Sequence, residues 1–290
     1  MQILQYLING IALGSVYALI ATGFSLIFNV LKFSNFSHGA LMTLSAFSGY
    51  FIAAGNGWGL VPTILVSVLT GAAVSLFGEF VAFRRILTHN TSPVYFFVSS
   101  ITLGTLYEGI VVLKVGANFY NYPRFFGKPY RIAGLFVARS DIIIFCISAA
   151  ALLLLAYMIR KTKTGRALRS VSFDRDTASL MGINVTRTIQ FAFIVSGALA
   201  GLAGVFLGIN YTLYPTMGSI VVKGFIASVI GGLGSLPGAI IGAMLLGILE
   251  TTLISIIGSG YAPVFTFVIM LVFLLVRPRG IAGSNIQEKA

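Results

Sequence analysis

Long apolar segments are the feature of this sequence that most limits its fold. A helix needs about 20 mostly apolar residues to cross the hydrocarbon core of a membrane. Six segments have about that length or more: residues 4–29, 60–83, 93–115, 141–159, 189–213 and 238–257. Three shorter or interrupted apolar segments cover 38–54, 219–235 and 263–276. We therefore predict an all-α polytopic membrane protein with about eight transmembrane helices, some short or broken, in a single transmembrane domain over residues 1–290.

The composition argues against a water-soluble enzyme. Hydrophobic residues make up 57% of the 290 residues and charged residues only 9%, and the mean hydropathy is +0.97. A soluble domain carries about a quarter charged residues. The net charge of +12 would also suit a nucleic-acid-binding protein, but such proteins gather their charge on one polar face, and here long apolar segments separate the charges. We expect contact with membrane lipid and none with nucleic acid.

Lys and Arg near the ends of the spans predict the orientation of the chain. The loop from Arg160 to Thr188 holds seven of the 19 basic residues, and it should be cytoplasmic: Arg160, Lys161, Lys163, Arg166, Arg169, Arg175 and Arg187. The loop over 116–140 is also basic, although the number of crossings places it outside. Either the excess of positive charge inside outweighs this loop, or a further span exists.

The cytoplasmic loop over 160–188 is too polar to span a membrane, but it is not featureless. Its apolar residues are spaced as in short amphipathic helices: Ala167, Leu168, Val171, Ala178, Leu180 and Met181. The apolar face of such helices needs a partner. That partner is either a docking protein or an anionic membrane surface.

Glycines recur at helical spacing, which lets helix backbones approach closely in lipid. The groups are Gly10 and Gly14, then Gly197, Gly201 and Gly204, then Gly238 and Gly242. They indicate tight packing inside this chain or at a subunit interface. The long segments that contain the first two groups resemble each other in outline, and each is followed by a break and a short apolar segment. Because they should cross in opposite directions, they are typical of an inverted repeat.

Ionisable and polar residues interrupt several apolar segments. The first break, KFSNFSHGAL, is either an unwound helix beside a pathway or an ordinary turn capped by Asn35 or Ser37. Glu79, Glu108 and Glu250 lie within apolar segments, where charged groups tend to face the bundle interior. Glu79 precedes Arg84 and Arg85 by little more than one turn and could form an ion pair there, and Lys223 could neutralise Glu250. A proton relay would require several of these groups to converge.

Motifs for covalent chemistry are missing from the sequence. No Walker A pattern and no HExxH pattern occurs, so an ATP-driven process would need another subunit. The lone Cys146 sits in an apolar segment, and the two histidines, His38 and His89, are far apart. A membrane-embedded enzyme is therefore the weaker hypothesis, and we expect no catalytic residue, bound metal or cofactor in this chain.

Five further motifs accompany the pattern GRALRSVSFDRDTASLMGIN, which begins at Gly165. In chain order they are NGIALGSVYALIATGFSLIF, SNFSHGAL, GEFVAFRRIL, SVIGGLGSLPGAIIGAMLLGILE and RPRGIAG. Together they resemble the LivH-type subunit of branched-chain amino-acid ABC transporter permeases. The resemblance covers nearly the whole chain, and it identifies the loop over about 160–188 as a cytoplasmic coupling loop.

The resemblance implies a multi-pass permease subunit of the bacterial cytoplasmic (inner) membrane that imports branched-chain or other small apolar amino acids. Its partners would be a second, LivM-like permease, two ABC ATPase subunits that hold ATP and Mg, and an extracytoplasmic solute-binding protein. The residues that would dock on the ATPase are Gly165, Arg166, Ala167, Leu168, Arg169, Asp174, Ala178 and Gly182. Polar residues that would line or brace the pathway are Asn9, Asn35, His38, Glu79 and Glu250.

The first break departs from the family pattern INFAHGE, because an alanine follows Gly39 where the family often has an acidic residue. Related permeases move urea, short amides or other small solutes, so these remain alternative substrates. A self-sufficient secondary transporter that uses Glu79, Glu108 or Glu250 as a proton site is the other alternative.

Overall fold

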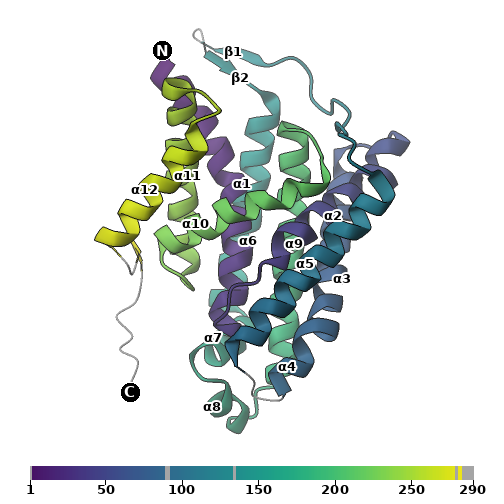
Figure 1. Cartoon of the computed structure of the whole chain (residues 1–290), viewed down its shortest axis with the longest axis vertical. Helices are drawn as coiled ribbons and strands as arrows, with labels where there is room; N and C mark the ends of the chain where they lie inside the picture. Colours follow the sequence, from purple (N-terminus) through teal and green to yellow (C-terminus); the bar gives the residue numbers. More distant parts are fainter. Residues whose placement is uncertain (1, 89–91, 133–134, 278–279, 283–290) are drawn as a thin grey trace.

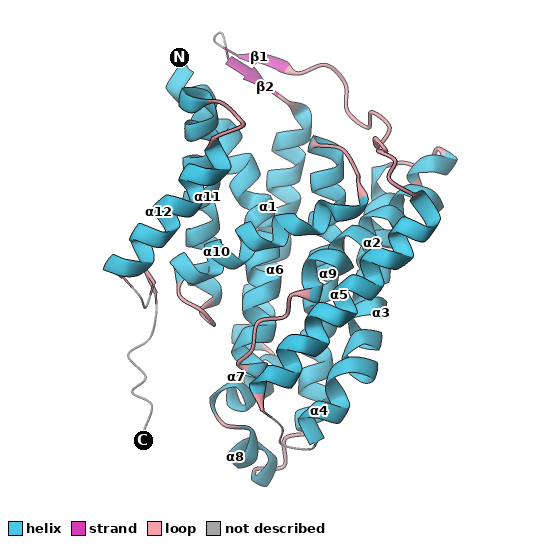
Figure 2. Ribbon diagram, in the orientation of Figure 1, coloured by secondary structure: helices cyan, strands magenta, loops and turns pink. Residues whose placement is uncertain are grey.

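The computed structural model describes residues 2–88, 92–132, 135–277 and 280–282 and consists mainly of helices (Figure 2). Within this part of the chain, six helical segments are long and apolar enough to span a membrane. The helices that form them are α1 (Gln2–Leu31), α3 (Leu60–Gly78), α5 (Pro93–Val115), α6 (Arg139–Lys161), α9 (Val185–Asn210) and α11 (Leu236–Ile257). The predicted all-α polytopic fold is confirmed.

Shorter helices lie where the sequence predicts short or interrupted spans. These are α2 (Ser37–Ile52), α10 (Val221–Gly231), which continues from the 3-10 turn η3 (Pro215–Ile220), and α12 (Ala262–Val276). A second 3-10 turn, η1 (Ala54–Asn56), follows α2. The span that begins with α3 continues past the end of that helix. A π-helical turn, η2 (Glu79–Phe83), joins α3 to α4 (Arg84–Thr88).

Two helices, α1 and α9, form the centre of the bundle (Figure 1). Most of each helix is buried: 89% of the most apolar 18-residue stretch in α1, and 78% of that in α9, lies inside the protein. They run in opposite directions. Gln5 near the start of α1 bonds to the backbone of Phe136, whereas Val30 near its end accepts from Arg175, ten residues before α9 begins. The expected antiparallel arrangement of the two long segments is confirmed.

The helices around this centre repeat one packing pattern. α1 packs mainly on α11, and α9 packs mainly on α3. In the same way α10 lies on α1 while α2 lies on α9, and each short helix also contacts the long helix that follows it. The units α1–α2–α3 and α9–α10–α11 therefore interlock as two halves of an inverted repeat.

Glycines provide the close approaches in both halves. A Cβ added to Gly247 of α11 would overlap the backbone of Gly14 in α1, and one added to Gly197 of α9 would overlap the backbone of Gly71 in α3. The two short helices also meet directly, because Gly39 of α2 and Gly218 of η3 lie backbone to backbone. Of the two readings of the glycine pattern, packing inside the chain accounts for these contacts.

A small β-hairpin lies in the loop between α5 and α6, where the sequence indicates only a connection. Strand β1 (Tyr130–Ile132) pairs antiparallel with β2 (Leu135–Val137), and Arg131 lies over the Phe136 ring at 4.5 Å. Figure 1 shows the hairpin at one end of the bundle and the helices of the 160–188 loop at the other. The basic loop over 116–140 is thus on the side opposite the more basic loop, and an additional span is not needed to explain it.

Candidate functional site

The loop over 160–188 folds into two short helices, α7 (Lys163–Phe173) and α8 (Arg175–Leu180), at one end of the bundle (Figure 1). Side chains cap each helix start. The Thr162 hydroxyl accepts from the Gly165 amide at 3.1 Å, and the Asp174 carboxylate accepts from the Thr177 amide at 2.9 Å. These caps satisfy backbone groups that a short helix would otherwise leave unpaired. The predicted short amphipathic helices are confirmed.

One face of these helices packs against the chain itself. Leu168, Val171 and Ala178 are buried. Gly165 is also buried, and a Cβ there would overlap the carbonyl oxygens of Met158 and Ile159 at the end of α6. Of the residues expected to dock on an ATPase, Gly165, Leu168 and Ala178 therefore fasten the two helices to the spans.

Two arginines hold the same unit to the ends of the spans. Arg169 donates to the Ile159 carbonyl of α6 at 2.7 Å, and Arg175 donates to the Val30 carbonyl of α1 at 2.8 Å. Both acceptors are at helix C-termini, where unpaired carbonyls favour a cation. Hydrogen bonds in this way attach α7 to α6, and the start of α8 to α1.

The other face is apolar and open. Phe173, Leu180 and Met181 are 83%, 88% and 78% exposed. A groove of about 610 Å³ lies between the two helices, and its lining includes Arg166, Arg169, Phe173, Asp174, Ala178 and Met181. Ala167 is partly exposed on α7. The apolar pattern in the sequence included Leu180 and Met181 but not Phe173. Phe173 directly precedes the helix cap Asp174, and that position could have marked it as an apolar residue at the junction of the two helices.

The turn after α8 needs a glycine. Gly182 has φ +81°, and its amide donates to the Ser179 carbonyl at 2.9 Å while the Ile183 amide donates to the Ala178 carbonyl at 3.0 Å. This is the Schellman arrangement that ends a helix. Hydrogen bonding from the Thr177 backbone amide lowers the pKa of Asp174, so the cap is charged at neutral pH. Asp174 and Gly182 thus fix the two ends of α8.

Glu79 lies beside this loop. It is fully buried, and its carboxylate pairs with the Arg84 guanidinium at 3.1 Å, which confirms the expected ion pair. A second groove, of about 250 Å³, joins Glu79 and Arg84 to Asp176 and Ser179 of α8. The carboxylate therefore braces the π-helical turn next to α8.

The first polar break is an irregular segment between α1 and α2 that also carries a local side-chain hydrogen bond. Lys32 has φ +58°, and an irregular segment then rises along the bundle to the start of α2 (Figure 2). Asn35 Oδ1 accepts from the Ser37 amide at 3.2 Å, so the helix is also locally capped. His38 is buried between α1 and α9, with Nδ1 at 3.4 Å from Ser196 Oγ.

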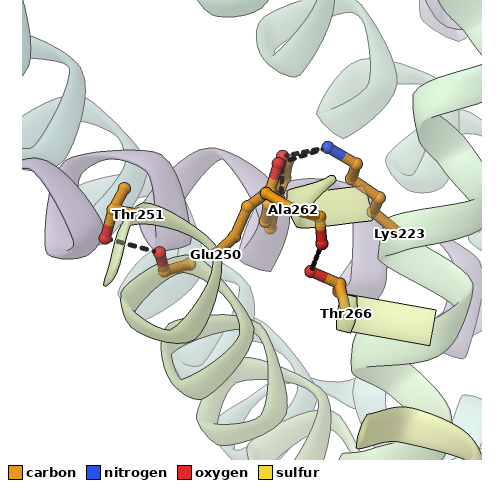
Figure 3. A network of polar contacts seen from close by, with 7 residues as sticks. Lys223, Glu250, Thr251, Ala262 and Thr266 are labelled. Atoms are coloured by element: carbon orange, nitrogen blue, oxygen red, sulfur yellow. Dashed lines mark hydrogen bonds and ion pairs between the residues drawn. The ribbon is translucent and has the colours of Figure 1, made fainter. Parts of the chain in front are cut away.

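Glu250 belongs to a buried network where α1, α10 and α11 meet. Figure 3 shows Lys223 of α10 directed toward Glu250 of α11. The two side chains form an ion pair, and the Tyr17 hydroxyl of α1 donates to Glu250 at 3.0 Å while Lys223 donates to that hydroxyl at 3.2 Å. Neutralisation of Glu250 by Lys223 is confirmed, and Tyr17 is a member that the sequence did not indicate.

The remaining expected pathway residues do not form one cluster. Asn9 is exposed near the start of α1 and accepts from Gln5 at 3.0 Å, far along the helix from His38's contact at Gly23. Within the described residues, no group of three His, Cys, Asp or Glu could hold a metal ion. His89 and Arg279 lie outside the described residues.

Sequence comparison then identifies the family. The profile described as "Branched-chain amino acid transport system / permease component" matches residues 6–276, almost the entire chain. The chain belongs to this family of permeases. It is a multi-pass protein of the cytoplasmic membrane and an ABC transporter permease subunit, as its relatives are.

Two relatives show how far the similarity extends. The chain is 32% identical to the high-affinity branched-chain amino acid transport system permease protein LivH of Escherichia coli (strain K12), over 99% of this chain and 97% of that protein. It is 31% identical to the permease BraD of Pseudomonas aeruginosa, with the same coverage of both chains. The recognition made from the ordered motifs is confirmed.

A solved structure agrees at the level of the fold. A metal-chelate type ABC transporter in an inward-facing conformation superposes with a TM-score of 0.53 at 15% identity, covering 94% of this chain and 86% of that one. This likeness concerns the arrangement of helices alone.

Proposed function

We propose that this permease subunit imports branched-chain or other small apolar amino acids, driven by ATP hydrolysis in partner subunits. The observation that carries the proposal is the pair of coupling helices. They present an open apolar face to the cytoplasm and are fastened to α1 and α6 by Arg175 and Arg169. The substrate class comes from the names of two relatives, both branched-chain amino acid permeases that match this chain over 97% of their length.

The exposed and buried residues of α7 and α8 have different roles in this proposal. Phe173, Leu180 and Met181 enter a groove on the ATPase, while Arg166 and Asp174 at the mouth of the 610 Å³ groove set the register. Buried Leu168 and Ala178 pass the displacement to the spans. Packed interfaces shift as rigid bodies, so closure of the ATPase pair would tilt α1 and α6 together.

The complete transporter would contain four kinds of chain. A second, LivM-like permease faces this one, two ABC ATPase subunits bind ATP and Mg, and an extracytoplasmic solute-binding protein delivers the amino acid. The basic loop over 116–140, which includes Arg124, Lys128 and Arg131, lies at the end opposite the coupling helices and suits an acidic docking protein.

The buried polar residues brace this machinery. Glu79 supports the π-helical turn next to α8, Glu250 ties α11 to α10 through Lys223, and His38 wedges α2 between α1 and α9. These pairings weaken the alternative of a self-sufficient proton-coupled transporter, because two of its three candidate glutamates are neutralised locally. Urea and short amides remain the alternative substrates.

Negative charge introduced on the coupling helices tests the proposal. Phe173→Glu and the pair Arg166→Glu with Arg169→Glu should remove ATPase subunits from the tagged protein when it is purified from native membranes. Phe119→Glu, at an exposed phenylalanine near the hairpin end, is the matched control and should retain them. The measurements are mass spectrometry of co-purified chains and leucine-stimulated ATP hydrolysis.

Two outcomes would contradict the proposal. If the wild type carries no ATPase yet moves leucine in vesicles with an ion gradient, the secondary transporter is correct. If ATPases remain bound to Phe173→Glu and hydrolysis stays coupled to uptake, the coupling surface lies elsewhere.

A further inference from the structure

Three polar residues lie among apolar ones on the exposed side of α5, and the hydroxyls of the two threonines donate to helix carbonyls one turn earlier. Thr102, Thr105 and Glu108 follow one another at three-residue spacing and so lie along one side of the helix. Thr102 and Thr105 are exposed and Glu108 is partly exposed. The other side of α5 packs into the bundle, where the buried Tyr107 donates to the Val74 carbonyl at 3.1 Å.

This polar side lies well below the membrane surface. Glu108 is seven residues before Val115, the last residue of α5, which places it about 10 Å along the helix from that end. Polar groups at this depth face protein or water rather than lipid. An ionisable residue there marks a functional site by default.

Glu108 differs from the other two glutamates of the apolar segments. Glu79 is paired with Arg84, and Glu250 with Lys223, both within this chain. Across the part of the chain that the structure describes, no ion pair or hydrogen bond involves the Glu108 side chain. Its carboxylate is therefore available to a cation that this chain does not supply.

The same side of the bundle contains the broken helix. A Cβ at Gly104, four residues before Glu108, would lie 3.3 Å from the Ser37 Cα at the start of α2. The partly exposed Phe36 packs edge-on against Phe97 of α5 with ring centroids 5.5 Å apart. The irregular backbone before α2 and the Phe36 ring therefore lie along the same side of α5 as Glu108, one to three turns before it, and interrupted helices of this kind surround solute sites in transporters.

We propose that the Thr102–Thr105–Glu108 side of α5 lines the solute pathway and that the Glu108 carboxylate binds the ammonium group of the amino acid in transit. The proposal rests on the proposed function and deepens it. In a water-poor pathway, a charge-assisted hydrogen bond between the two groups is strong. Further along the same side of α5, the partly exposed Phe36 offers apolar surface to the pathway.

Substitution of Glu108 tests the binding role in the complete transporter, with radiolabelled leucine in vesicles. Glu108→Gln should reduce uptake about tenfold or more, the effect of losing one charge-assisted hydrogen bond, while Glu108→Asp should retain more activity. ATPase subunits should remain bound to both variants. Uptake by Glu108→Gln equal to that of the wild type would overturn the proposal. Wild-type complex that shows no ATP-driven uptake of leucine would instead overturn the proposed function.

Thiol labelling tests the pathway independently of activity. In a Cys146→Ser background, Thr105→Cys should react with a charged, water-soluble reagent at least about tenfold faster than Leu153→Cys, since only a hydrated thiol ionises and reacts readily. Leu153 is the matched control because it is 71% exposed in the middle of the apolar helix α6. Leucine delivered by the binding protein should slow the labelling of Thr105→Cys, and adding Glu108→Gln should abolish this protection. Equal, slow labelling of both cysteines would show that this side of α5 is dry and would overturn the proposal.

Discussion

Two buried carboxylates in this protein are each neutralised by a basic side chain of the same chain. Lys223 and Glu250 come from different helices and meet beside the Tyr17 hydroxyl, so the carboxylate has partners for both of its oxygens. Glu79 is neutralised by an arginine only five residues away. A buried pair of this kind adds little to stability when intact but is costly when one member is removed.

The Lys223–Glu250 pair should therefore show strong coupling. Glu250→Leu leaves the Lys223 ammonium without its anion, and we expect a loss of about 3 kcal/mol in the free energy of unfolding. Lys223→Met should have a similar effect, and the double variant Lys223→Met/Glu250→Leu should recover most of the loss. Thermal unfolding of the purified proteins in detergent measures all four states. Additive effects of the two single changes would contradict the coupling.

Among the elements, α8 depends most on its ends. It has six residues, too few for intrinsic helix stability, so Asp174 at its start and Gly182 after its end determine whether it forms. The proposed coupling role of α8 thus relies on these two residues for the shape of the helix as well as for any contact with a partner.

Removal of the Asp174 cap should loosen α8. Asp174→Ala should speed amide hydrogen exchange over Arg175–Leu180, whereas Asp174→Asn, which keeps an acceptor, should stay close to the wild type. Unchanged exchange in Asp174→Ala would show that Gly182 and the packing of Ala178 suffice.

The same cap predicts a pH dependence. Because the pKa of Asp174 is lower in the folded protein than its ordinary value, its contribution is fully present above the ordinary pKa and is lost as pH falls through the lowered one. Protection of α8 should therefore stay constant from neutral pH down to about pH 4. Protease cleavage in the loop over 160–188, followed across that range, measures it, and increased cleavage between pH 7 and 5 would be inconsistent with this assignment.

The whole molecule has two chemically different ends, with the hairpin at one and the coupling helices at the other (Figure 1). Between them the units α1–α2–α3 and α9–α10–α11 interlock, and the two ends are joined by the central helices α1 and α9.

Orientation in the membrane follows from this polarity. In a Cys146→Ser background, Ser179→Cys on α8 should react with an impermeant thiol reagent only from the cytoplasm, and Lys128→Cys only from outside. Both positions are exposed, so each serves as the control for the other. Labelling in the reverse sense would place the coupling helices outside and contradict the positive-inside assignment.

Sequence alone predicted most of the architecture because the membrane limits the choices. Apolar length located the spans, and the 3.6-residue period located α7 and α8. Local pairings, such as Glu79 with Arg84, followed from spacing. The hairpin at 130–137 was not predicted, because a few residues of cross-strand pairing leave no periodic signal. The division of the loop's apolar residues into a buried set around Leu168 and an exposed set around Phe173 depends on how α7 docks on α6, which one sequence does not contain.

The central position of α1 has a consequence for how the protein is made. This helix is synthesised before its main packing partners, because the groove that receives it is built largely from α9, α10 and α11. The close contact between Gly14 and Gly247 can form only after Gly247 has been synthesised, more than 200 residues later. That delay corresponds to roughly 10–50 s of synthesis. During that interval the glycine-lined side of α1 faces lipid or the insertion machinery. The nascent chain should therefore remain associated with the insertase until its C-terminal helices emerge, and truncation before α11 should expose it to membrane proteases.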